Sequence, residues 1–148
     1  MESLVIAAGC DHAGINFKQQ LIQHMQSKDA TIIDVGCFPG EVVDYPIYAK
    51  AVCDKINQNQ AQYGLIVCGG GMASSMAANK FLGIRCALCH DYWTAETSRK
   101  KYNCNVIALG ERTMSYWVAE EIVDIFFATK FDSCEDNRRR INLIDSLI

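Results

Sequence analysis

Short runs of consecutive apolar residues alternate along this chain with segments in which apolar residues recur every three or four positions. The continuous runs are typical of strands buried on both faces, and the spaced pattern is typical of amphipathic helices. The predicted strands are residues 4–8, 31–35, 63–68, 83–89 and 105–109. The predicted helices are residues 14–28, 46–56, 74–80, 94–102, 117–128 and 135–147. Residues 37–44 are predicted to form a loop, with Pro39-Gly40 as its turn signal.

This regular alternation predicts an α/β protein, a Rossmann-like three-layer sandwich with a five-stranded parallel sheet. We found no internal repeat, low-complexity segment or linker, so the pattern favours a single domain over residues 1–148. Ligands of such folds bind at the carboxyl ends of the strands. Polar residues follow the predicted strand ends at Cys10-Asp11-His12, Asp44-Tyr45, Cys68–Ser75, His90-Asp91 and Gly110-Glu111-Arg112. We therefore expect one functional site at this edge of the sheet.

Composition excludes several classes of partner. Half of the 148 residues are hydrophobic and 21% are charged, which is typical of a soluble globular protein. A net charge of -3 gives no basic surface for nucleic acid or for an anionic membrane. The apolar runs are far shorter than the roughly 20 residues of a membrane span. The first residues lack the basic region and long apolar core of a signal peptide, so we expect a cytoplasmic protein.

Most of the eight cysteines are interpreted as small buried hydrophobic residues, and a disulfide framework is disfavoured. Most lie within apolar runs, as do Cys53, Cys86 and Cys89. The segment Cys86-Ala-Leu-Cys89-His90 matches the c-type haem attachment pattern. Haem attachment requires export, however, and these cysteines lie inside a predicted strand. A zinc site is also disfavoured, because no second ligand pair follows at a suitable spacing.

The strand at residues 63–68 delivers Cys68 to a turn of three consecutive glycines. Glycines allow unusual torsions and close approach to a ligand, and their N–H groups can form an anion site with the following helix. Such a position favours the thiolate form of a cysteine. The turn is neither a P-loop nor a dinucleotide fingerprint, because no Lys-Ser pair follows and Ala73 and Ser74 come after Gly71. A tight turn without a ligand remains the alternative.

Two other polar segments each allow a structural and a functional interpretation. Asp11 is suited to cap the following helix, and Asp11-His12 could also contact a phosphate or a sugar hydroxyl. Arg138-Arg139-Arg140 could form a solvated helix face in which Glu135 pairs with Arg139. The same arginines could instead hold a phosphate, for example in the site of a neighbouring subunit.

In their order and spacing, segments spread over nearly the whole chain resemble ribose-5-phosphate isomerase B and its sugar-phosphate isomerase relatives. The segments that carry the resemblance are Asp11-His12-Ala13-Gly14, Asp44-Tyr45-Pro46, residues 64–69, Ala77-Ala78-Asn79-Lys80, Gly83-Ile84-Arg85 and residues 105–112. The resemblance implies interconversion of an aldose phosphate and a ketose phosphate, with no metal and no other cofactor. It also implies a homodimer with the site at the interface, or a tetramer.

The resemblance assigns roles to individual residues. Cys68 is implied to be the base that moves a proton between C1 and C2, and the turn amides are implied to stabilise the enediolate. Lys101 and His90 are the other catalytic candidates. The candidate substrate-binding residues are Asp11, His12, Gly69, Gly70, Gly71, Met72, Ala73, Ser75, Tyr102, Arg112, Glu135 and Arg139.

The chain departs from the family pattern in the glycine turn and at position 101. The family usually has threonine at the position of Gly70 and glycine at the position of Ala73, and Ser74 or Ser75 could supply the missing hydroxyl. Lys101-Tyr102 stands where the family commonly has His-Asn, and that histidine opens the sugar ring. A lysine ammonium holds its proton far more tightly than an imidazolium does. His90 or His12 could take over this role, or the enzyme could use open-chain substrate.

A further departure concerns phosphate binding and substrate choice. Glu135 stands in place of the first arginine of the terminal pair, and Lys101 could restore the positive charge. Similar losses occur in the galactose-6-phosphate isomerase branch. The resemblance implies conversion of ribose 5-phosphate to ribulose 5-phosphate in the pentose phosphate pathway. The departures leave galactose 6-phosphate, allose 6-phosphate or a tetrose phosphate as alternative substrates. A noncatalytic phosphosugar-binding protein is a third reading, and a flavin or nucleotide module is disfavoured.

Overall fold

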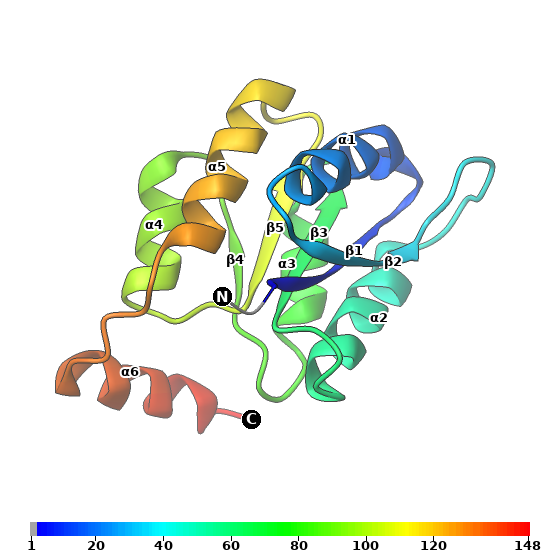
Figure 1. The fold of residues 1–148 in the computed structure, drawn as a ribbon. Coiled ribbons are helices and arrows are strands. Elements are labelled where there is room, and N and C mark those ends of the chain that lie inside the picture. The colour runs from blue at the N-terminus through cyan, green and yellow to red at the C-terminus, as the bar shows by residue number, and fades with distance from the viewer. Residues whose placement is uncertain (1–2) are drawn as a thin grey trace.

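The computed structural model describes residues 3–148, and the first two residues of the predicted domain lie outside this range. Strands and helices alternate along the chain (Figure 1). The strands are β1 (Val5–Cys10), β2 (Thr31–Gly36), β3 (Tyr63–Cys68), β4 (Cys86–Leu88) and β5 (Val106–Gly110). The α-helices are α1 (Ile15–Gln26), α2 (Tyr45–Asn57), α3 (Met72–Ala78), α4 (Tyr92–Lys100), α5 (Tyr116–Ala128) and α6 (Glu135–Asp145), and a short 3-10 helix, η1 (His12–Gly14), precedes α1.

The five strands form one parallel sheet in the order β2-β1-β3-β5-β4, with helices on both faces (Figure 1). This confirms the predicted α/β three-layer sandwich. One core lies between the sheet and helices α1, α4 and α5, and a second lies between the sheet and helices α2 and α3. In β3, Leu65 and Val67 face the first core and Ile66 faces the second. Burial of both faces explains why the strands are continuous apolar runs.

The structure shifts several predicted boundaries for local reasons. Helix α3 begins at Met72 rather than at residue 74, because the left-handed Gly71 directly precedes it. Helix α4 begins at Tyr92 rather than at residue 94, because Asp91 and Thr94 form a capping box. Strand β4 is shorter than the predicted 83–89, and Gly83 with its positive φ turns the chain before the strand.

Helix α6 lies at the end of the molecule where the strands begin, below α4 in Figure 1. It buries Asn137 and Ile141, and Arg85 holds its last turn by an ion pair of 2.9 Å to Asp145. The apolar residues Leu143 and Ile144 at the end of α6 are exposed. Helix α6 is therefore attached to the body of the protein by a small set of contacts.

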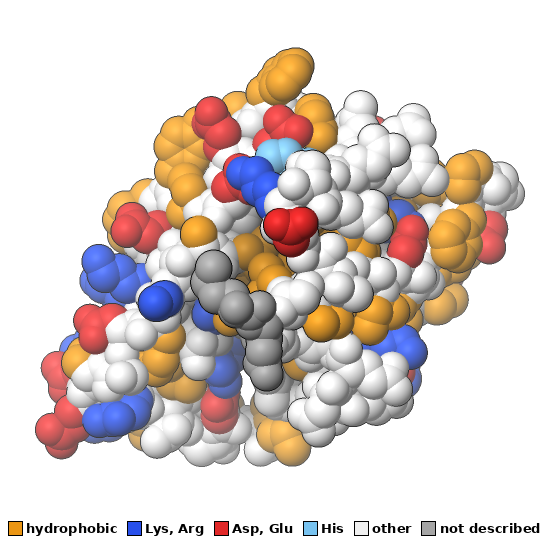
Figure 2. Space-filling view, viewed as in Figure 1, with side chains coloured by type: hydrophobic (Ala, Val, Ile, Leu, Met, Phe, Trp, Pro, Cys, Tyr) orange, Lys and Arg blue, Asp and Glu red, His pale blue; other side chains and the backbone are white. Residues whose placement is uncertain are grey.

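No helix within residues 3–148 is long and apolar enough to cross a membrane. The face shown in Figure 2 carries acidic and basic side chains interspersed with apolar ones. This view shows no large surface of a single charge sign, in keeping with the small net charge of -3.

Candidate active site

The glycine turn places Cys68 at the carboxyl end of β3, in the middle of the sheet. The Cys68 thiol is 5% exposed, and its Sγ accepts a hydrogen bond of 3.0 Å from the N–H of Gly71. The end of β5 is tied to the same turn, because the N–H of Glu111 donates to the Cys68 carbonyl and that of Arg112 donates to the Gly69 carbonyl. A thiol is thus held next to a cluster of backbone donors.

Close backbone packing explains two of the glycines. Gly71 has φ +76°, and a Cβ placed there would lie 2.6 Å from Leu88 Cδ1 and 3.0 Å from the Leu109 carbonyl carbon. A Cβ on Gly110 would lie 2.6 Å from the Gly70 carbonyl carbon. Any larger residue at either position would push the turn away from β5. The site therefore depends on the absence of these side chains.

Asp11 and His12 follow β1, which is the neighbour of β3, and so they lie at the same edge of the sheet. The N–H of Asp11 donates to the Val67 carbonyl at 3.3 Å, and Asp11 Oδ1 accepts from the N–H of Ala13 at 3.0 Å. Asp11 is thus the predicted N-cap, with its second carboxylate oxygen unused by that contact. His12 is exposed, and its Nδ1 lies 3.1 Å from the Val43 carbonyl oxygen and 3.3 Å from the Val43 nitrogen.

Arg112 brings positive charge to the turn. A Cβ placed on Gly69 would lie 3.7 Å from Arg112 Cζ, so the guanidinium covers this glycine. Arg112 is itself exposed. One chain therefore brings together Cys68, the amides that follow it, Asp11 and Arg112. Together these groups can bind an anionic oxygen beside a thiol.

The start of α3 supplies the remaining residues of the turn. Met72 is 60% exposed and Ala73 is half-buried, whereas Ser74 and Ser75 are buried. The Ser75 hydroxyl donates to the Met72 carbonyl at 2.7 Å. Ser74 Oγ is buried and has no hydrogen-bond partner among the described residues. Ser75 is thus engaged with the backbone, and Ser74 points into the protein interior.

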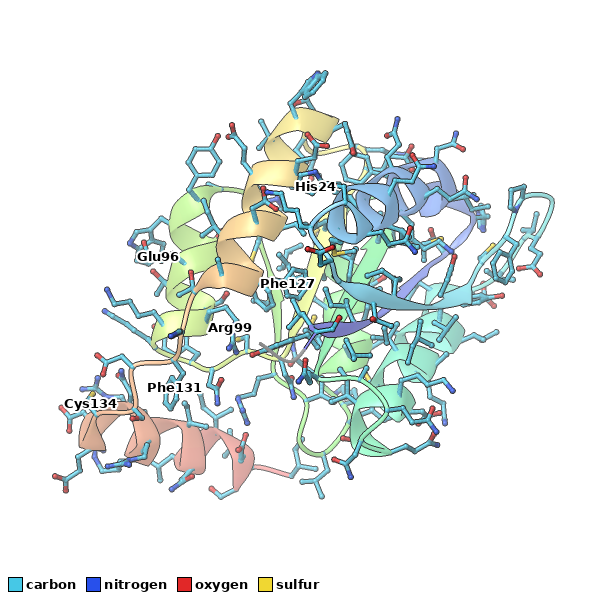
Figure 3. The ribbon with its side chains drawn as sticks, in the orientation of Figure 1. His24, Glu96, Arg99, Phe127, Phe131 and Cys134 are labelled. Carbon is cyan, nitrogen blue, oxygen red and sulfur yellow. The ribbon has the colours of Figure 1, made fainter. Side chains whose placement is uncertain are left out.

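Four predicted site residues lie at the opposite edge of the sheet in the same chain. Lys101 and Tyr102 follow α4, which returns to the side where β4 begins, and the Tyr102 carbonyl accepts from Arg85 Nε at 3.1 Å. Glu135 and Arg139 belong to α6. Figure 3 shows this end of the molecule through Arg99 near the end of α4 and Cys134 at the start of α6, whereas the β3 arrow in Figure 1 points to the other end. These four residues do not share a pocket with Cys68 of their own chain.

His90 does not lie on a strand next to that of Cys68, and the terminal arginines do not pair with the predicted partner. His90 is exposed at the carboxyl end of β4, and β5 separates that strand from β3. Arg139 and Arg140 pair with Asp136, at 3.5 and 3.7 Å, and not with Glu135 as the sequence suggested. Glu135 is exposed beside them.

Six of the other seven cysteines are buried, which agrees with the prediction for most of them, and Cys134 is exposed. All eight cysteines are free, and burial raises the pKa of Cys10, Cys53 and Cys104 to about 12. Burial also raises the pKa of Cys89 to about 11 and that of Cys86 well above its ordinary value. Among residues 3–148, no group of three or more histidine, cysteine, aspartate or glutamate residues could hold a metal ion.

Glu111 belongs to the polar segment at the end of β5, but the sequence patterns assigned this glutamate no role of its own. Its Oε2 is buried without a hydrogen-bond partner among the described residues. Burial raises the pKa of Glu111, Arg112 opposes the rise, and Asp11 adds to it. The available signal was its position directly before Arg112, but a glutamate at a strand end is usually exposed.

The fold and this site define an open α/β protein in which a buried thiol and the amides of a glycine turn lie at the carboxyl edge of a parallel sheet. The chain belongs to the Ribose/Galactose Isomerase family, whose pattern matches residues 6–144. It is therefore a member of a family of sugar-phosphate isomerases.

Individual relatives cover most of the chain. It is 38% identical over 145 residues to galactose-6-phosphate isomerase subunit LacB of Clostridium acetobutylicum. The matched region spans 98% of this chain and 84% of that protein. It is 34% identical over 134 residues to ribose-5-phosphate isomerase B of Escherichia coli, with 90% of each chain covered. The solved structure of Clostridium thermocellum ribose-5-phosphate isomerase B superposes with a TM-score of 0.95 at 32% identity and covers 97% of both chains.

Proposed function

We propose that this chain is a single-domain aldose–ketose isomerase, over residues 1–148, that interconverts ribose 5-phosphate and ribulose 5-phosphate in the pentose phosphate pathway. The observation that carries the proposal is the Cys68 thiol held beside the glycine-turn amides, with Arg112 over Gly69. Membership of the family supports the reaction class. Free thiols throughout the chain support a cytoplasmic location, because reducing compartments keep cysteines unpaired.

In the proposed reaction, Cys68 Sγ removes the proton from C2 of the open-chain aldose and returns it to C1. A second proton passes from the C2 oxygen to the C1 oxygen, so the reaction is balanced without an external reductant. The N–H of Gly71 stabilises the thiolate, and the amides from Gly69 to Ala73 stabilise the negative oxygens of the enediolate. Asp11 and His12 bind the sugar or its phosphate, and Arg112 binds anionic oxygens.

The proposal includes a homodimer in which the second chain completes each site. Lys101, Tyr102, Glu135 and Arg139 are exposed and lie far from Cys68 of their own chain. Exposed apolar residues that an interface would cover lie on both sides: Met72 and Met76 on α3, and Leu143, Ile144, Leu147 and Ile148 at the C-terminus. Ring opening is assigned to Lys101 of the second chain, with His90 as the alternative acid.

The experiment that tests the proposal follows exchange of the substrate C2 proton with solvent deuterium. We expect Cys68→Ala to reduce this exchange and the turnover of ribose 5-phosphate by at least about 1,000-fold, because the base is removed. The control is Cys134→Ser, which changes an exposed cysteine outside the turn and leaves both rates unchanged. Undiminished exchange in the Cys68 variant would refute the assignment of the base.

Galactose 6-phosphate is the second candidate substrate, since the relative at 38% identity is a galactose-6-phosphate isomerase subunit. Glu135 in place of an arginine, and Gly70 in place of a hydroxyl residue, fit a changed sugar or phosphate position. A panel of ribose 5-phosphate, allose 6-phosphate, galactose 6-phosphate and erythrulose 4-phosphate separates the candidates by kcat/KM. A higher kcat/KM for a non-pentose favours the second candidate. Thermal stabilisation by these sugars without turnover indicates a noncatalytic binding protein.

A further inference from the structure

Lys18 on α1 is a fully buried lysine to which the proposed reaction gives no role. Its Nζ forms an ion pair with Asp34 Oδ1 at 2.6 Å and donates to the Cys37 carbonyl at 3.0 Å. The Phe38 ring lies against the same ammonium, with its centroid 5.0 Å from Nζ. A buried ammonium is costly unless such partners are present, so this arrangement is specific to one placement of residues 34–38.

The partners of Lys18 fix the chain where it leaves β2. Asp34 Oδ1 also accepts from the N–H of Gly36 at 3.0 Å. The N–H of Cys37 donates to the Cys10 carbonyl at 3.0 Å, next to the end of β1. Lys18 thus holds the first residues of the 37–44 segment beside the end of β1, which Asp11 directly follows.

The rest of the 37–44 segment is tied to these first residues and reaches the candidate site. The N–H of Phe38 donates to Glu41 Oε2 at 3.0 Å, and the N–H of Glu41 donates back to the Phe38 carbonyl at 3.2 Å. Tyr48 on α2 donates its hydroxyl to the same Glu41 oxygen at 3.1 Å. Two residues later, both backbone groups of Val43 meet His12 Nδ1.

The two Val43 contacts require opposite protonation of the ring. When the Val43 N–H donates to Nδ1, the proton of a neutral imidazole is on Nε2, and Nε2 is then a donor to a ligand. When Nδ1 donates to the Val43 carbonyl, Nε2 is an acceptor. Because the two distances are 3.3 and 3.1 Å, a small displacement of Val43 changes which contact is made.

We propose that Lys18 is a positioning residue that sets the orientation and tautomer of His12 by anchoring the 37–44 segment. This inference rests on the proposed function only through the role of His12 in binding substrate. The path runs from Lys18 to Cys37 and Phe38, then through Glu41 to Val43 and the imidazole.

The test is the double variant Lys18→Met, Asp34→Asn, which removes both charges and retains most of the side-chain volume. In the free protein, we expect the nitrogen-15 NMR shifts of the His12 ring to change. Amide hydrogen exchange in residues 37–44 should rise by about tenfold or more. KM for ribose 5-phosphate should rise by about tenfold while kcat changes less, because misplacement of a binding group weakens binding.

The matched control is Lys50→Met, Asp54→Asn, which removes an exposed ion pair of 2.5 Å on α2 and leaves all three readouts unchanged. Glu41→Gln provides a second route, because it weakens the same path at an exposed residue and leaves Lys18 intact. If the double variant does not fold, the His12 shifts of the Glu41 variant decide the question. Unchanged His12 shifts in a folded variant would overturn the inference. The NMR and hydrogen-exchange measurements need no substrate, so inactivity toward ribose 5-phosphate would refute the proposed function alone.

Discussion

Gly71 shows how the candidate site depends on a single missing side chain. Its left-handed backbone would cost an alanine about 1–2 kcal/mol. Its Cβ would also collide with Leu88 and with the backbone of Leu109. The same residue donates its N–H to Cys68 Sγ, so a shift of the turn would move the thiol as well.

We therefore expect Gly71→Ala to lower the free energy of unfolding by about 2–5 kcal/mol, the sum of backbone strain and overpacking. Gly40→Ala is the matched control, because Gly40 also has a positive φ but has open space around its Cβ position. It should cost only about 1–2 kcal/mol. Urea denaturation of both variants gives the difference, and equal losses would show that crowding at the turn is unimportant.

Glu111 makes stability depend on pH in a defined direction. Burial raises its pKa in the folded protein above the ordinary value of 4.5, so the folded state binds the proton more tightly than the unfolded chain. The contribution of this group is therefore most favourable below 4.5 and is lost as the pH rises through the folded value.

Glu111→Gln carries no ionisable group, so its stability relative to the wild type should rise as the pH rises from about 4 to 7. Urea denaturation at several pH values measures this difference. Glu96→Gln, at an exposed position on α4, is the control and should show no such trend (Figure 3). A constant difference between the Glu111 variant and the wild type would contradict the burial argument.

At the scale of elements, the sequence predicts the order and type of the strands and main helices because continuous and spaced apolar patterns differ clearly. It misses the starts of α3 and α4 by two residues, since Gly71 and Asp91 set them through backbone conformation and capping. It predicts the convergence of Asp11, Cys68 and Arg112, because parallel strands end at one edge. It does not reveal that Lys18 is buried, since a charged residue in a helix is normally exposed.

Helix α6 is the element that the fewest contacts hold in place. Arg85 Nη1 contacts both carboxylate oxygens of Asp145, at 3.1 and 2.9 Å. The Nε and Nη2 groups of the same arginine donate to backbone carbonyls that follow α4. Arg85 thus connects the end of α6 to the end of α4. The two predicted site residues on α6, Glu135 and Arg139, depend on this attachment.

Asp145→Asn should raise amide hydrogen exchange in α6 by roughly fivefold, the equivalent of about 1 kcal/mol for a partly exposed ion pair. The exchange of the central strands should not change, because Asp145 makes no contribution to the sheet. Asp136→Asn on the same helix is the control, because its partners Arg139 and Arg140 lie within α6. Equal effects of both variants would show that Arg85 is not the anchor.

At the scale of the whole molecule, the predicted site residues of one chain lie in two groups at opposite ends of the sheet. Cys68, Asp11 and Arg112 lie at the carboxyl edge of the sheet, and Lys101 and Arg139 lie beyond its amino edge. A sequence has no direct signal for this separation, because it depends on the direction in which α4 and α6 run. A second chain can join the halves if the proposed dimer packs the α6 end of one chain against the turn of the other.

Mixing two inactive variants tests this arrangement. Cys68→Ala removes the base from one half, and Arg139→Ala removes a phosphate ligand from the other, so each homodimer has two defective sites. Random exchange of chains gives about half heterodimers, and each heterodimer has one site with both residues intact, so about a quarter of the sites should recover. The readout is kcat for ribose 5-phosphate after mixing and refolding together, compared with each variant refolded alone. If the halves belonged to one chain, every site would stay defective and no activity would return, which would rule out the shared site.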